Sequence, residues 1–302
     1  MPKNRLSYLF IPLLALIWGS SFILMKLGMF DTSGNTIFSS TQVASIRIVL
    51  AGLVFIPLFP RLYRKLANKK DLLYFCIVGL GGNLIPAFLF TYAEKSLDSS
   101  IAGIMNSFTP VFTLLLGFIL FRAKIVLQQV LGTLIGFSGI TWLLLAGQSS
   151  RTDAQLIPAL AIILATILYG LSVNTIKHKL QQYKPLEVAT GGFSMAFLPA
   201  LICFFLFDTS QVITEHPKAM QGILAIGTLG LIGTAFAVVL FNHIIAQTSA
   251  LAASAVTYFI PIVAVMIGLG FGETLVWQQY IAMFVIIFGV LLINFTPQKA
   301  TK

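Results

Sequence analysis

The chain has 302 residues, of which 58% are hydrophobic and only 9% are charged, and its formal net charge is +10. Soluble domains carry roughly a quarter of charged residues, so this composition excludes a water-soluble protein and indicates that the chain contacts lipid. The positive charge lies in short segments between apolar runs, which favours membrane topology over nucleic-acid binding as its explanation.

Ten apolar stretches follow one another along the chain, and most reach the length of about 20 residues that a helix needs to cross a hydrocarbon core. They cover residues 6–28, 41–60, 72–93, 99–121, 125–146, 156–177, 187–207, 220–246, 250–272 and 276–296. Continuous apolar runs favour helices over the alternating strands of a barrel. The first run is longer than a signal-peptide core and has no clear cleavage site, so we interpret it as a retained membrane helix.

The first five stretches resemble the last five. Matched residues lie 151 positions apart: Trp18, Gly19, Lys26, Gly79, Gly82, Phe108 and Pro110 correspond to Tyr169, Gly170, Lys177, Gly230, Gly233, Phe259 and Pro261. An odd number of spans in each half turns the second half upside down relative to the first. Inverted repeats of this kind are typical of secondary transporters.

Basic residues predict the orientation. With the N-terminus in the cytoplasm, fourteen basic residues face inward: Lys3, Arg5, Arg61, Arg64, Lys65, Lys69, Lys70, Arg122, Lys124, Lys177, Lys179, Lys184, Lys299 and Lys302. Only Lys95, Arg151 and Lys218 then fall in outer loops. This bias follows the positive-inside rule and predicts that both termini are cytoplasmic, in agreement with an even number of spans.

The opening helix, with Trp18-Gly19-Ser20-Ser21-Phe22 followed by Lys26, resembles that of EamA-domain proteins in the drug/metabolite transporter superfamily. Arg47 in the second stretch also matches the family, as do these residues of later stretches: Pro110, Gln128, Gln129, Pro261, Gly272, Glu273, Gln278 and Gln279. The resemblance implies an all-α integral membrane protein with ten transmembrane helices, in two inverted five-helix EamA repeats at 8–146 and 156–296. It also implies a central cavity between helices 1–4 and 6–9, with helices 5 and 10 at the periphery.

Two positions depart from the family pattern. The glutamate that usually precedes the fifth helix of a repeat is present as Glu273 in the second half, but the matching residue of the first half is Ala123. The second half also has no arginine that matches Arg47. The two halves are therefore expected to be specialised differently.

A carrier needs a polar, water-accessible site near the middle of the membrane. We expect the substrate cavity to include polar and aromatic residues within the stretches: Trp18, Arg47, Asn83, Tyr92, Asn106, Tyr169, Asn174 and His243. A charge inside lipid is costly, so we interpret Arg47 as a ligand for a substrate carboxylate or phosphate. The alternatives are that Arg47 snorkels to the interface, and that the amides and aromatic rings pack between helices.

No acidic residue falls clearly in the middle of a stretch. The candidates for coupling transport to protons are His243, which can titrate near neutral pH, and Glu94 and Glu273 at outer helix ends. Without coupling, the chain would be a facilitator. Cys76 and Cys203 belong to no metal or redox spacing, so we expect neither a metal nor a cofactor.

Together these features predict a permease or exporter of small organic metabolites such as amino acids or drugs, which works by alternating access around a central cavity. An uncoupled facilitator or channel is the alternative. An intramembrane enzyme is disfavoured because the three histidines, His178, His216 and His243, are scattered. The expected location is a bacterial cytoplasmic (inner) membrane. The expected partners are a small-molecule substrate, lipid and a coupling proton, but no nucleic acid, and both a monomer and a homodimer stay open.

Overall fold

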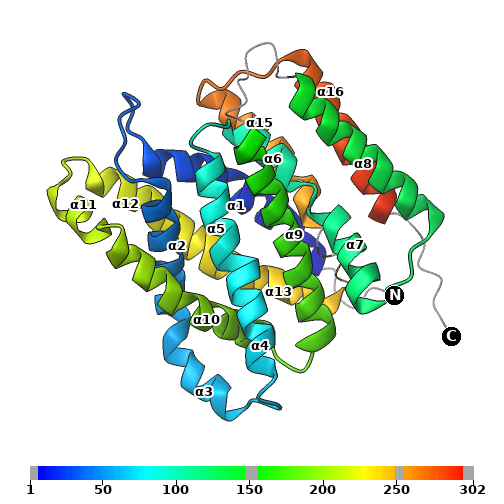
Figure 1. The fold of residues 1–302 in the computed structure, drawn as a ribbon, viewed down its shortest axis with the longest axis horizontal. Coiled ribbons are helices and arrows are strands. Elements are labelled where there is room, and N and C mark those ends of the chain that lie inside the picture. The colour runs from blue at the N-terminus through cyan, green and yellow to red at the C-terminus, as the bar shows by residue number, and fades with distance from the viewer. Residues whose placement is uncertain (1–5, 147–155, 249, 251–252, 254, 295–302) are drawn as a thin grey trace.

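Long apolar helices form nearly all of the structure, a computed structural model that describes residues 6–146, 156–248, 250, 253 and 255–294 (Figure 1). Within these residues the only β-structure is an isolated bridge between Phe30 and Thr36. Five of the basic residues used above to predict orientation lie outside the described ranges: Lys3, Arg5, Arg151, Lys299 and Lys302. The expected all-α class is therefore seen in the part of the chain that the structure describes.

The first half runs from α1 to α8. Its elements are α1 Leu6–Met29, α2 Ser40–Phe55, η1 Ile56–Leu58, α3 Phe59–Arg64, α4 Asp71–Cys76, η2 Ile77–Leu84, α5 Ile85–Ala93, α6 Ser99–Asn106, α7 Thr109–Phe121 and α8 Leu127–Ala146. The second half consists of α9 Leu156–Lys179, α10 Pro185–Leu206, α11 Thr209–Glu215, α12 Ala219–Thr228, η4 Leu229–Phe236, α13 Ala237–Gln247, η5 Ala255–Tyr258, α15 Ile260–Gly270 and α16 Trp277–Asn294.

Seven helical segments of the described residues are long and apolar enough to cross a membrane, several of them built from consecutive short elements: Phe10–Met29, Ser40–Arg64, Asp71–Ala93, Ser99–Phe121, Leu156–Lys179, Pro185–Leu206 and Ala219–Gln247. Two shorter apolar helices are Val256–Gly270 and Trp277–Ile293, and α8 is a further apolar helix of 20 residues. Many large apolar side chains remain exposed on these helices, including Leu16, Ile119, Leu134, Leu164, Leu198, Phe205, Met266 and Phe284. Such a surface suits lipid and not water.

Within the described residues, each half contains a helix that is interrupted just before a proline, and each half contains a π-helical segment. The fourth helix breaks between α6 and α7, just before Pro110, and η5 likewise gives way to α15 just before Pro261. Proline fits the first turn of a new helix because it lacks the N–H group that a helix interior would use. The π-helical segments are η2 in the third helix and η4 in its counterpart. These irregular segments lie toward the centre of the bundle, beside the continuous helices α1, α2 and α9.

α8 and α16 pack side by side at one edge of the bundle (Figure 1). Their backbones approach so closely that a Cβ atom on Gly132 would lie 2.5 Å from the carbonyl oxygen of Gly289. Small residues commonly permit this close packing between membrane helices. The position agrees with the expectation that helices 5 and 10 are peripheral.

Loops that the predicted orientation places on the same side of the membrane contact one another. Lys65 forms an ion pair with Glu187 at 2.9 Å, and the Tyr183 hydroxyl donates to Asp71 at 2.6 Å, so residues 65–71 meet residues 183–187. Lys218 and Asp31, in two other loops, form an ion pair at 2.6 Å.

Candidate functional site

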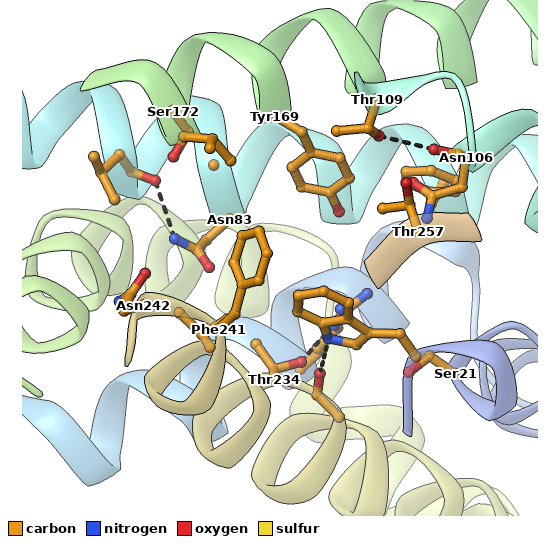
Figure 2. A pocket seen from close by; sticks show the side chains of 18 of the residues that line it. Ser21, Asn83, Asn106, Thr109, Tyr169, Ser172, Thr234, Phe241, Asn242 and Thr257 are labelled. Carbon is orange, nitrogen blue, oxygen red and sulfur yellow. Dashed lines mark hydrogen bonds between the residues drawn. The ribbon is translucent and has the colours of Figure 1, made fainter. Parts of the chain in front are cut away.

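A cavity of about 120 Å³ lies at the centre of the bundle, between the two halves (Figure 2). That volume holds several water molecules. Its walls come from α1, α2, η2, α5, α9, η4, η5 and α13. The residues on either side of the break between α6 and α7 complete them. Polar side chains are among its lining: Ser21, Arg47, Asn83, Asn106, Thr109, Tyr169, Ser172, Thr234, Asn242 and Thr257.

Most of the lining residues occur as repeat-matched pairs. Eight pairs separated by 151 positions have both members in the wall: Trp18/Tyr169, Ser21/Ser172, Phe22/Val173, Met25/Ile176, Gly82/Gly233, Asn83/Thr234, Phe90/Phe241 and Asn106/Thr257. The aromatic contacts follow the same relation. Trp18 meets Phe241 edge to face with ring centroids 5.0 Å apart, and Phe90 stacks with Tyr169 at 6.0 Å. Each half therefore supplies equivalent groups to one shared cavity.

The π-helical segments present matched polar side chains to this cavity. The Asn83 amide donates to the carbonyl of Val78 at 3.0 Å, and the Thr234 hydroxyl donates to the carbonyl of Leu229 at 2.9 Å. In each case the acceptor lies five residues earlier, in the widened turn of η2 or η4. π-Helical turns leave backbone groups that need other partners and are frequent at functional sites. Here side chains satisfy them.

Glycine allows each π-helical segment to reach the first helix of the other half. A Cβ atom on Gly233 would lie 3.0 Å from the Ser21 hydroxyl, and one on Gly82 would overlap Ser172. The indole N–H of Trp18 donates to the carbonyl of Gly233 at 3.1 Å. At these glycines of the cavity wall, the two halves are therefore in close contact.

Arg47 is the one charged residue of the cavity wall and has no arginine counterpart in the second half. Its Nε donates to the Thr234 hydroxyl at 2.7 Å, and its Nη1 lies 3.8 Å from the sulfur of Met25. Among the described residues Arg47 has no carboxylate within ion-pair distance. Its charge therefore stays available to an anionic group in the cavity.

Two amide oxygens of the wall are buried without a hydrogen-bond partner, those of Asn106 and Asn242. The amide nitrogen of Asn242 donates to the carbonyl of Pro185 at 3.4 Å, which leaves only its oxygen unpaired. Buried polar atoms normally have partners, so these two acceptors mark places where a donor from a bound molecule or water fits.

Five of the eight residues expected in the cavity line it: Trp18, Arg47, Asn83, Asn106 and Tyr169. The other three lie elsewhere. Tyr92 is 42% exposed with the Lys95 ammonium over its ring, and the Asn174 amide donates to the carbonyls of Thr113 and Gly170. His243 shares a hydrogen bond with Gln247 and packs edge-on against Phe10.

Several polar residues of the wall escaped the sequence analysis, notably Ser21, Ser172, Thr234, Asn242 and Thr257. A usable signal was present for two of them, because adding 151 to Asn83 and Asn106 gives Thr234 and Thr257. Ser21 and Ser172 are also separated by this offset. The offset gave no such signal for Asn242, because its counterpart Thr91 does not line the cavity. The Thr91 hydroxyl instead donates to the carbonyl of Ala87 on the same helix.

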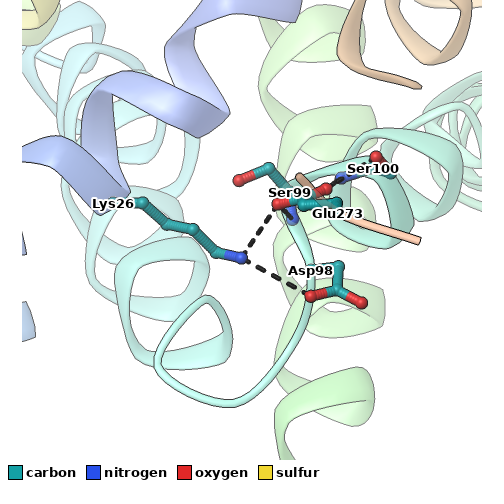
Figure 3. A network of polar contacts seen from close by, with 5 residues as sticks. All are labelled: Lys26, Asp98, Ser99, Ser100 and Glu273. Atoms are coloured by element: carbon teal, nitrogen blue, oxygen red, sulfur yellow. Dashed lines mark hydrogen bonds and ion pairs between the residues drawn. The ribbon is translucent and has the colours of Figure 1, made fainter. Parts of the chain in front are cut away.

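A polar network lies at one end of the bundle and is here called the Lys26 network; it consists of Lys26, Asp98, Ser99, Ser100 and Glu273 (Figure 3). Lys26 lies 2.9 Å from Glu273 and 3.7 Å from Asp98. Glu273 also accepts from the backbone N–H groups of Ser99 and Ser100 at the start of α6, and from the Ser100 hydroxyl. Burial acts to raise the pKa of Glu273, but the hydrogen bonds from Ser100 and Lys26 and the charge of Lys26 outweigh it and hold the pKa below its usual range.

The other end is built differently. Lys177, the counterpart of Lys26, donates to the backbone carbonyl of Ile245 at 3.2 Å. A second pocket beside Lys177, Gln181 and Tyr183 shares Ile176 and Asn242 with the central cavity. In the described part of the chain, no three His, Cys, Asp or Glu side chains gather into a metal site.

Apolar helices of membrane-spanning length around a central, partly polar cavity define a multi-pass membrane transporter. The EamA-like transporter family model matches residues 5–145 and 156–295. The chain belongs to this family, and the resemblance noted in its sequence is confirmed.

Relatives agree with this class. The chain is 28% identical to the uncharacterized inner membrane transporter YedA of Escherichia coli K12, over 93% of this chain and 88% of that protein. It is 24% identical to a probable terminal-alkyne amino-acid exporter of Streptantibioticus cattleyicolor, over 92% of this chain and 89% of that protein. A protein of known crystal structure shares the fold with a TM-score of 0.66 at 15% identity, over 97% of both chains. The family and these names indicate an integral membrane transporter of the cytoplasmic membrane rather than an enzyme.

Proposed function

We propose that this chain is a secondary carrier that moves a small organic solute across the membrane by alternating access around the central cavity. The observation that carries the proposal is the cavity wall of eight repeat-matched pairs with Arg47 as its one unmatched charge. Two equivalent half-walls allow the site to open to either side by rocking one half against the other. A single unmatched cation gives the solute a preferred orientation.

We further propose ten membrane helices in two inverted repeats, 8–146 and 156–296, with both termini in the cytoplasm. α1 ends near Lys26, at the end of the bundle that holds the Lys26 network. α9, its counterpart, ends at Lys179, beside the loop whose Tyr183 contacts Asp71. Matched helices thus end at opposite faces, which supports the inversion. The loops around Asp71 and Tyr183 and the helix ends beside them carry eight of the nineteen lysines and arginines, which supports a cytoplasmic location for that face: Arg61, Arg64, Lys65, Lys69, Lys70, Lys177, Lys179 and Lys184.

The proposed substrates are zwitterionic metabolites such as amino acids. The Arg47 guanidinium suits a carboxylate, and the unpartnered oxygens of Asn106 and Asn242 suit the N–H donors of an ammonium group. The aromatic rings of Trp18 and Phe241 offer an apolar wall for a side chain. The name of the Streptantibioticus relative is consistent with this class of substrate.

The test is counterflow of radiolabelled L-amino acids in proteoliposomes that contain the purified full chain. We expect saturable exchange, and we expect Arg47→Ala to weaken apparent affinity by about 10- to 100-fold, the usual value of a hydrogen bond to a charged group. Arg47→Lys should retain part of the affinity because it keeps the charge. Arg64→Ala, an exposed arginine outside the cavity, is the matched control. Unchanged exchange in Arg47→Ala, at normal protein insertion, would rule out this site.

A further inference from the structure

Glu94 is a buried carboxyl group with no hydrogen-bond partner. It follows the last residue of α5, four residues after Phe90 of the cavity wall, and is 1% exposed. Neither of its carboxyl oxygens has a hydrogen-bond partner. A buried ionised carboxylate without a donor carries a large desolvation cost, so the group is favoured in its neutral, protonated form.

Two other buried acids of the described residues, Asp31 and Asp71, and the half-buried Glu273 have hydrogen-bond donors around them. Asp31 accepts from Lys218 and from two backbone N–H groups, and Asp71 accepts from the hydroxyl of Tyr183. Glu273 accepts from Lys26 and from the start of α6. Each of these three has donors that stabilise the charged form. Glu94 differs from these three acids because neither of its carboxyl oxygens has a hydrogen-bond donor.

Glu94 lies within electrostatic range of the Lys26 network. The charges that act on it are Lys26 from α1, Glu273 from the segment after α15, and Arg47 from α2. Burial raises the pKa of Glu94 well above its usual range, Glu273 acts in the same direction, and Lys26 and Arg47 act against it. On its own loop, Lys95 is exposed and Asp98 contacts Lys26. Lys26 thus forms ion pairs with Glu273 and Asp98, and it acts on Glu94 electrostatically without a hydrogen bond to it.

We propose that Glu94 is a proton-binding site whose occupancy controls the Lys26 network. With the network closed, Lys26 pairs with Glu273 and Asp98, and Glu94 keeps its proton. When that end opens, water reaches Glu94, the carboxyl O–H bond breaks, and the proton passes to water at that face. Lys26 can then exchange Glu273 for the new carboxylate, which stabilises the open end. This inference rests on the proposed carrier function in one respect, because the proton is a coupling ion of transport only if the chain is a carrier.

The first test measures the protonation state of Glu94 directly. Infrared spectra of the full chain in lipid vesicles should contain, at neutral pH, the carbonyl band of a protonated carboxylic acid, which shifts in D₂O. We expect Glu94→Gln to lose this band and Glu215→Gln, which changes an exposed acid, to keep it. Absence of the band from the unchanged protein, or its persistence in Glu94→Gln, would overturn the proposal.

The second test measures opening of the closed end. In a background with Cys76→Ala and Cys203→Ala, maleimide labelling of Leu97→Cys, a buried site of this region, is divided by labelling of Ser210→Cys, an exposed site. If deprotonation drives opening, the ratio should rise with pH, by up to about tenfold per pH unit, and Glu94→Gln should abolish the rise. An equal rise in both proteins contradicts the coupling. Neither test needs solute flux. Failure of the Glu94 proposal is therefore distinguishable from failure of the carrier proposal, which is tested by counterflow.

Discussion

At the scale of single residues, two buried asparagines of this chain have opposite circumstances. The amide nitrogen of Asn174 donates to the carbonyls of Thr113 and Gly170 at 2.8 and 2.9 Å, so it joins α9 to α7. Asn106 lies in the cavity wall with its amide oxygen unpaired. The same residue type therefore serves helix packing in one place and leaves an unpaired acceptor in the cavity wall in the other.

This contrast predicts different effects of the same substitution. Asn174→Ala removes one hydrogen bond from α9 to Thr113 of α7 and one to Gly170 within α9, and we expect it to destabilise the protein by about 1–2 kcal/mol while leaving substrate affinity unchanged. Asn106→Ala should weaken apparent affinity by about two- to tenfold with little change in stability. Thermal unfolding in detergent and the concentration dependence of counterflow measure the two effects. If the effects are interchanged, the cavity has been assigned the wrong amide.

Sequence identified which residues are polar within the spans but not the direction in which each side chain faces. Phe90 and Tyr92 lie on one short helix, and two residues correspond to about 200° of rotation, so Phe90 meets the cavity and Tyr92 faces outward. Arg47 and Asn83 were recognisable because a mid-span polar group needs a partner inside the bundle. Asn174 satisfied the same rule with a neighbouring helix, a choice that only the packing decides.

At the scale of elements, the two π-helical segments face the cavity together with the continuous helices α1, α2 and α9. η2 and η4 each carry a glycine that contacts the other half and a polar residue that bonds five residues back along the chain. Sequence located these segments through the recurrence of Gly79, Gly82, Gly230 and Gly233. It did not predict their π-helical turns, because these depend on side-chain bonds to displaced carbonyls that local propensity does not reveal.

The regular helices α8 and α16 provide the matching contrast. Their interface depends on Gly132, Gly136 and Gly289, and they contribute nothing to the cavity wall. A Cβ atom on Gly289 would lie 2.5 Å from the backbone nitrogen of Gly136, so Gly289→Leu forces these helices apart.

We therefore expect Gly289→Leu to destabilise the protein by about 1–3 kcal/mol, as overpacking usually does. Substrate affinity of the correctly inserted fraction should be unchanged, because α16 lies away from the cavity. Unfolding temperature and counterflow of the same preparation test both statements. The exposed residue Phe284 of α16 supplies the control, since Phe284→Leu should leave stability nearly unchanged. A large loss of affinity in Gly289→Leu would show that α16 takes part in the site.

At the scale of the whole molecule, two nearly equivalent halves are closed unequally. Glu273 joins Lys26 to the start of α6, whereas the matching position in the first half is Ala123 and the Lys177 ammonium donates to the backbone carbonyl of Ile245. This asymmetry was visible in the sequence as a missing glutamate, but its consequence was not. The ion pair joins segments 247 residues apart, and only the folded bundle brings them together.

If the Lys26 network has to open during each transport cycle, a covalent link across it should stop transport. In the background with Cys76→Ala and Cys203→Ala, Lys26→Cys and Glu273→Cys place one thiol on each half at this end. A short bismethanethiosulfonate linker replaces the length of the removed side chains and joins the two thiols.

We expect the linker to reduce counterflow in the double variant to background and dithiothreitol to restore it, because the links are disulfides. Each single cysteine variant should react with the same reagent and afterwards keep the flux that this variant had before the reaction, which separates cross-linking from simple modification. Flux that continues at the unlinked level after complete cross-linking, verified by mass spectrometry, would mean that this end stays closed while solute crosses. In that case the two halves do not rock about the cavity, and alternating access would have to be abandoned for this chain.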